Sequence, residues 1–180
     1  MISGMTTLRT LVLSIALTVT LITSAQAERR VVRVEDGITV EEEVDANRAL
    51  PILFGTATMN ASAQRIAAWV GAVHTYTEWQ HNCEEARVLP QEDGTTLTYN
   101  RIGSPWPVSD RDVVLRSIRT NRTDGSIHIE FSRTEDADLA VPRGVVRMPR
   151  LIGSYDLTPV EAGTHVVYTG DSDPGRRLPA

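Results

Sequence analysis

Apolar and polar residues alternate over most of the chain, in short segments separated by turn residues. The alternation is clearest at residues 126–133, where Ile127, Ile129 and Phe131 are each followed by a polar residue. A period of two is typical of strands with one buried face. Asp-Gly dipeptides mark turns between such segments. The pattern predicts strands at residues 31–34, 38–44, 51–59, 86–89, 95–102, 112–120, 126–133, 144–148, 151–158 and 165–170.

One segment has helical periodicity instead. Apolar residues recur at three- and four-residue spacing from Ile66 to Val73, and Asn60 precedes them as a candidate N-cap. We therefore expect a helix over residues 61–73, followed by a connector rich in Trp and Tyr over residues 74–82. Strand hairpins beside one internal helix predict an α+β fold, in which an antiparallel sheet packs against the helix.

The first residues have the pattern of an export signal. Arg9 supplies a positive charge, residues 10–22 are apolar and uncharged, and Ala25-Gln26-Ala27 has the small-x-small pattern of a cleavage site. A membrane-spanning helix needs about 20 apolar residues, so this run is too short; a buried N-terminal helix is the alternative. We expect residues 1–27 to be a signal peptide, residues 28–180 to be one domain, and the protein to be periplasmic or secreted.

Composition excludes several kinds of function. The net charge of -5 argues against nucleic acid as a partner, because phosphate binding needs concentrated positive charge. The 18 basic residues are all arginines, which excludes a Schiff-base or P-loop lysine. Cys83 is the single cysteine, so stability must come from the core rather than from a disulfide. His81 lies near Cys83, but without further ligands at zinc spacing we expect no metal and no cofactor.

Sequence signals for catalysis are weak. No Gly-x-Ser-x-Gly elbow is present. A nucleophile pair of His81 and Cys83 would require two side chains on one strand face to meet at about 3 Å. Paired carboxylates such as Glu84-Glu85 are typical of solvent-exposed side chains in a loop or at a strand end, rather than of a catalytic pair. The residues alone therefore disfavour a catalytic role and predict an exported α+β domain.

Four segments of the chain match one known family in the same order. They are residues 76–89, 105–115 (where Trp106 lies between two prolines), 142–147 and 173–179. Together they resemble the START (StAR-related lipid-transfer) domain family, from about Asp36 to Ala180, which is nearly the whole predicted mature chain. The resemblance implies a helix-grip fold, in which a curved antiparallel sheet wraps around a long C-terminal helix and a lipid-sized tunnel lies between them.

The resemblance also implies which side chains face the tunnel. Alternate positions of the strands at 95–102 and 112–120 point inward, the strand at 126–133 contributes its apolar face, and Trp106 packs as a wedge at the turn. The predicted ligand-binding residues are Thr96, Thr98, Asn100, Trp106, Val113, Leu115, Ser117, Ile127, Ile129 and Phe131. Some family members hold a buried acid–base pair where this chain has Thr98 and Ser117, which indicates an uncharged interior and a neutral headgroup. Arg111 and Asp112 are expected to pair and to tie the turn to the sheet.

The implied function is binding, and possible transport, of a lipid or other apolar small molecule by a monomer with transient membrane contact. An enzyme on the same scaffold, such as a cyclase or hydrolase, is the alternative, and a cavity group with a perturbed pKa would favour it. A protein-interaction domain is a third option.

The family's C-terminal helix would begin near Leu178. We therefore expect the sequence to be a fragment or frameshifted form, the other option being closure of the cavity by a partner or a membrane.

Overall fold

The computed structural model describes residues 29–90 and 95–175. The predicted signal peptide and the predicted start of a C-terminal helix lie outside these residues. The strands are β1 (Arg29–Glu35), β2 (Ile38–Glu43), β3 (Ile52–Met59), β4 (Cys83–Leu89), β5 (Thr96–Ile102), β6 (Arg111–Asn121), β7 (Ile127–Arg133), β8 (Val146–Arg147), β9 (Arg150–Val160) and β10 (Gly163–Asp173). The helical segments are α1 (Ala63–Val70), the 3-10 helix η1 (Val73–Thr75) and α2 (Tyr76–Trp79).

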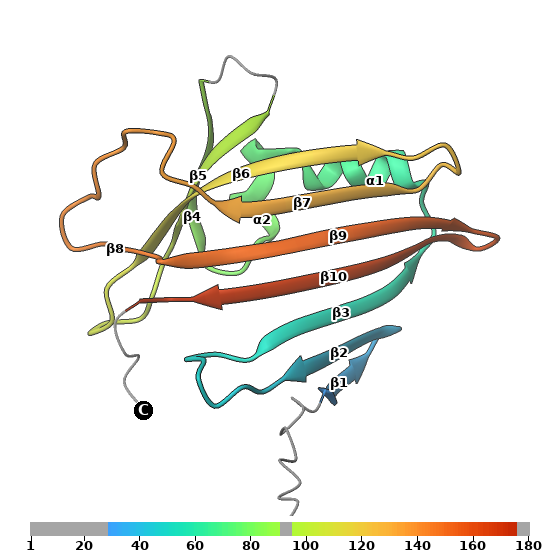
Figure 1. Cartoon of the computed structure of the whole chain (residues 1–180), viewed down its shortest axis with the longest axis horizontal. Helices are drawn as coiled ribbons and strands as arrows, with labels where there is room; N and C mark the ends of the chain where they lie inside the picture. Colours follow the sequence, from blue (N-terminus) through green and yellow to red (C-terminus); the bar gives the residue numbers. More distant parts are fainter. Residues whose placement is uncertain (1–28, 91–94, 176–180) are drawn as a thin grey trace, which may run out of the picture.

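The strands form one curved, 10-stranded sheet in the order β1-β2-β3-β10-β9-β7-β6-β5-β4 (Figure 1). β8 pairs in parallel with β6, and the neighbours along the order are antiparallel. Short turns explain most of this order. Asp36 and Gly37 both have positive φ (50° and 76°), the backbone that a tight hairpin between β1 and β2 requires. The predicted α+β fold with an antiparallel sheet is confirmed.

Helix α1 begins later and ends earlier than the pattern predicted. Ser62, with extended backbone, is the N-cap, and its hydroxyl oxygen accepts a hydrogen bond from the backbone N–H of Arg65 at 3.3 Å. The predicted cap, Asn60, lies two residues too early. At the other end the backbone N–H of Gly71 caps the carbonyl of Ala67 at 3.0 Å. The following connector contains η1 and α2, which were not predicted.

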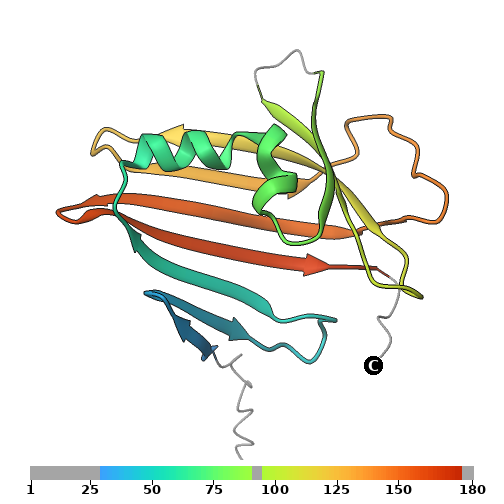
Figure 2. The ribbon, with the colours of Figure 1, turned by 180° about the vertical axis from the view of Figure 1, so that it is seen from behind.

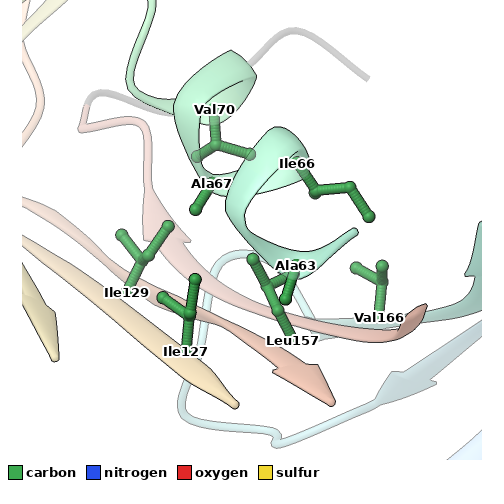
Figure 3. Close-up of a cluster of buried hydrophobic side chains, with 8 residues drawn as sticks. All are labelled: Ala63, Ile66, Ala67, Val70, Ile127, Ile129, Leu157 and Val166. Atoms are coloured by element: carbon green, nitrogen blue, oxygen red, sulfur yellow. The ribbon is translucent and has the colours of Figure 1, made fainter. Parts of the chain in front are cut away.

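The helices cover one face of the sheet. Figure 2 shows α1 and α2 in front of the β6–β9 half of the sheet, while β3, β2 and β1 carry no helix on that face within the described ranges. In the main core, shown in Figure 3, the apolar stripe of α1 packs on side chains of β7, β9 and β10. The buried members of this core are Ala63, Ile66, Ala67, Val70, Ile127, Ile129, Leu157 and Val166. Each large aliphatic side chain buried here contributes about 1.5–3 kcal/mol.

The other face of β4, β5 and β6 carries a second core. Leu97, Tyr99 and Val114 are buried there, and Ala137 and Leu139 from the loop after β7 pack against them. Strand β5 is therefore packed on both faces, because alternate residues point to opposite sides. This double packing fixes the direction in which Thr98 and Asn100 point.

A buried ion pair joins β6 to β8. The carboxylate of Asp112, which is fully buried, accepts hydrogen bonds from Nε and Nη2 of Arg147 at 2.7 and 3.0 Å. The expected pairing of Arg111 with Asp112 was wrong, because successive side chains of a strand point to opposite faces. Arg111 instead donates to the backbone carbonyls of Ser109 and Pro174, at 2.5 and 3.4 Å. The ion pair holds the start of β6 against the segment that leads into β9.

Candidate ligand-binding cavity

A cavity of about 700 Å³ lies between the helical segments and the sheet. Its volume is within the range of about 300–1,000 Å³ that is usual for small-molecule sites. Helix α1, η1 and α2 line one side, and β5, β6, β7, β9 and β10 line the other. Its apolar and aromatic lining residues include Ala67, Val70, Val73, Tyr76, Trp79, Ile102, Val113, Leu115, Ile129, Phe131, Leu151, Tyr155 and Tyr168.

Strands β5 and β6 bring six of the sequence-predicted residues to one wall of the cavity. The antiparallel register pairs Thr96 with Ser117, Thr98 with Leu115, and Asn100 with Val113, and the cavity is lined by all of them. Ile129 and Phe131 of β7 also line the cavity. The structure thus gathers these side chains where the resemblance placed them, and their role in ligand binding stays a prediction.

Two predicted site residues lie elsewhere. Ile127 is buried beneath α1, in the main core rather than in the cavity lining. The side chain of Trp106 is 92% exposed, so the expectation that it packs as a wedge was wrong. The loop is held by Asp110 instead: its carboxylate accepts hydrogen bonds from the backbone N–H of Ser104 at 3.1 Å and from Nε of Arg101 at 2.9 Å.

Three aromatic rings form a cluster on the β7–β9–β10 side of the cavity. The ring centres of Phe131 and Tyr155 are 6.1 Å apart, and those of Tyr155 and Tyr168 are 5.1 Å apart. The glycines Gly153 and Gly170, paired on β9 and β10, leave room for these rings, because a Cβ atom would overlap Phe131 at the first position and Tyr168 at the second. Sequence reasoning missed this cluster, although glycines inside strands signal a close approach.

The buried tyrosines in the lining of the cavity do not supply a base at neutral pH. Burial raises the pKa of Tyr155 and of Tyr168, so both phenols stay protonated and neutral. Burial likewise raises the pKa of Tyr76, whose hydroxyl donates to the carbonyl of Val70 at 2.6 Å. No Asp or Glu from the described ranges lines the cavity, and its Arg119 and His81 are exposed.

The model of the START domain family matches residues 55–180. The chain belongs to the START domain family. An uncharacterized protein of Pseudomonas aeruginosa is 30% identical over 147 residues, which cover 81% of this chain and 72% of the relative. The predicted family membership is thereby confirmed.

Solved structures place this START domain in the helix-grip fold. The crystal structure of a STAR-related lipid transfer protein from Xanthomonas axonopodis (fragment 25–204) is 25% identical, with a TM-score of 0.75, and covers 84% of this chain and 85% of that chain. The human StAR-related lipid transfer protein 5 is 16% identical, with a TM-score of 0.69, and covers 84% and 74%. At that lower identity the likeness concerns the fold alone.

The helical side of this START domain is stabilised by aromatic stacking. Trp69 of α1 stacks on Trp79 of α2, with ring centres 4.1 Å apart, and the Trp79 indole N–H donates to the hydroxyl of Thr75 at 3.2 Å. Trp69 is half exposed because it covers Trp79 instead of the sheet. These contacts hold the very short α2 in place over the cavity.

Within 29–90 and 95–175, no group of three or more His, Cys, Asp or Glu side chains is arranged to hold a metal ion. No helix in that part of the chain has the length and hydropathy needed to cross a membrane.

Proposed function

We propose that this START domain binds one lipid or other small apolar molecule in the cavity and carries it between donor and acceptor surfaces. The observation that carries the proposal is the cavity of about 700 Å³ with apolar and aromatic side chains on both sides. Moving apolar ligand surface out of water into such a site contributes about 25 cal/mol per Å². The X. axonopodis relative, described as a STAR-related lipid transfer protein, supports transfer as well as binding.

The interior favours a neutral ligand. Thr98 and Ser117 occupy the positions where some relatives were expected to hold an acid–base pair, and both face the cavity. An anionic headgroup buried beside Thr98 and Ser117 would meet hydroxyls there, because Arg119 of the same wall is exposed, and an unpaired buried charge is costly. The phenols of Tyr155 and Tyr168 stay protonated because burial raises their pKa, so they can donate hydrogen bonds but do not act as bases.

Native mass spectrometry of the protein, purified without detergent, tests the binding proposal. We expect a bound neutral lipid in the wild type and its loss in Leu115→Trp, because the larger side chain occupies cavity volume. Ile118→Trp is the matched control: it adds a tryptophan on the same strand, on the face that points away from the cavity. The proposal fails if no lipid is bound or taken up by the folded wild type, or if only anionic lipids bind.

The site of action is proposed to be periplasmic or extracellular. Support comes from the apolar run at residues 10–22 and the cleavage pattern Ala25-Gln26-Ala27. Cell fractionation and N-terminal sequencing of the exported protein test it, with a mature terminus expected at Glu28. Retention of the complete chain in the cytoplasm would contradict this part of the proposal and leave ligand binding unaffected.

A further inference from the structure

One polar atom in the cavity wall has no hydrogen-bond partner. The side chain of Asn100 is only 5% exposed and lines the cavity, and its Oδ1 atom is buried without a partner. In the described part of the chain, the other buried side-chain atom in this condition is Nε of Arg133, which lies outside the lining. Buried polar groups are nearly always paired, so this exception calls for an explanation.

The neighbours of Asn100 donate no hydrogen bond to its side-chain oxygen. Across the sheet it lies between Ala86 of β4 and Val113 of β6. Along β5 the adjacent inward residues are Ile102, which is apolar, and Thr98, whose hydroxyl makes no hydrogen bond to Oδ1. Packing of Leu97 and Tyr99 on the opposite face fixes the strand, so Asn100 cannot turn away to solvent. The amide oxygen of Asn100 thus has no donor within hydrogen-bond distance, while its side chain lines the cavity.

We propose that Asn100 is a specificity-determining residue whose side-chain oxygen accepts a hydrogen bond from a hydroxyl or amide N–H of the ligand. The inference rests on the proposed binding function and narrows its ligand class. The class is a neutral amphiphile with a donor at its polar end, such as a long-chain alcohol, an acylglycerol with a free hydroxyl, or a fatty amide. A ligand with acceptors only, such as a wax ester or an ether, leaves the oxygen unpaired and loses the corresponding free energy.

Hexadecanol and its methyl ether form a matched probe pair, because they share the chain and differ in the donor. Each is titrated against a fluorescent fatty probe bound in the cavity of the purified wild-type chain. We expect the alcohol to bind about tenfold more tightly than the ether, the ratio that one satisfied buried hydrogen bond gives. Asn100→Leu should reduce this ratio to about one, chiefly by weakening binding of the alcohol.

Asn47→Leu is the control for the same chemical change outside the cavity, since Asn47 is exposed in the loop between β2 and β3. It should keep the wild-type ratio. Equal binding of alcohol and ether by the wild type overturns this inference and leaves lipid binding intact, whereas failure of probe, alcohol and ether to bind sinks the proposed function itself. If folded Asn100→Leu still binds the alcohol more tightly than the ether by the wild-type ratio, the inference about Asn100 is also overturned. The wild-type comparison decides alone if circular dichroism shows that the variant is unfolded.

Discussion

The buried ion pair between Asp112 and Arg147 gives the sharpest prediction on stability. Asp112→Ala removes a carboxylate that is fully buried and leaves the guanidinium of Arg147, itself only 19% exposed, without the acceptor of its two short hydrogen bonds. The arginine also donates to the carbonyl of Leu139 at 3.3 Å, which replaces little of what is lost. The perturbation is thus an uncompensated buried charge rather than a lost surface contact.

The size of the effect follows from the burial. Removing one partner of a buried pair costs about 3–5 kcal/mol, because the desolvation of the remaining charge is no longer offset. For a chain of 150–250 residues, 1 kcal/mol corresponds to about 2–4 °C in the unfolding midpoint, so we expect a decrease of about 10 °C. The β6–β8 connection should loosen first, since Asp112 is one of the residues that pair β6 with β8.

Thermal and urea unfolding followed by circular dichroism measure this change. Glu85→Ala is the matched control, because its carboxylate pairs with Arg87 on the surface, where both side chains are 46% exposed. Exposed pairs contribute little, so the midpoint should stay at the wild-type value. A midpoint for Asp112→Ala that is equally unchanged would refute the reasoning. The double variant Asp112→Leu with Arg147→Met should recover stability, since no charge remains buried.

Three further predictions concern the helix cap, the aromatic cluster and the effect of pH. Ser62→Ala should destabilise by about 1 kcal/mol through loss of the cap on the Arg65 N–H, as urea unfolding can show; an unchanged midpoint would argue against the cap. Gly170→Ala should displace the ring of Tyr168 and cost about 1–3 kcal/mol, with weaker probe binding; unaltered stability and binding would contradict the close contact. The pKa values of Tyr155 and Tyr168 are raised from 10.0, so the folded state holds its protons more tightly than the unfolded state. Stability should therefore be complete below pH 10 and fall as the pH rises above it; ultraviolet titration showing ordinary phenol ionisation in the folded protein would exclude this.

The sheet was largely predictable because its determinants are local. Alternation located β7 through Ile127 and Ile129, and Asp36-Gly37 located the first hairpin. The face of β5 and β6 that lines the cavity came from the resemblance, and strand parity then fixed several side chains at once. Ile127 shows the limit of this reasoning: parity gives the face of a strand, but it does not say whether a helix or a cavity lies above that residue.

The missed features depend on contacts between distant parts of the chain. Asp112 pairs with Arg147 because β8 lies beside β6 in parallel. No local sequence pattern predicts this pairing of two distant segments. Helix α2 is too short for a detectable period, and stacking with Trp69 stabilises it. The unpaired oxygen of Asn100 is likewise a property of its packed surroundings. Trp106 was misjudged because a tryptophan between two prolines resembles an anchor, whereas the carboxylate of Asp110 holds that loop.

The pairing of β3 with β10 has a consequence for how the chain reaches this structure. Residues 52–59 pair with β10, more than 100 residues later, so the N-terminal three-stranded unit cannot join the sheet until residues 163–173 are present. Contacts so far apart in sequence carry a high loop-closure cost and slow folding. Until β10 arrives, β3 presents an unpaired edge that the corresponding strand of a second molecule can occupy, which is the usual route to strand exchange and aggregation. Refolding yield should therefore fall steeply with protein concentration.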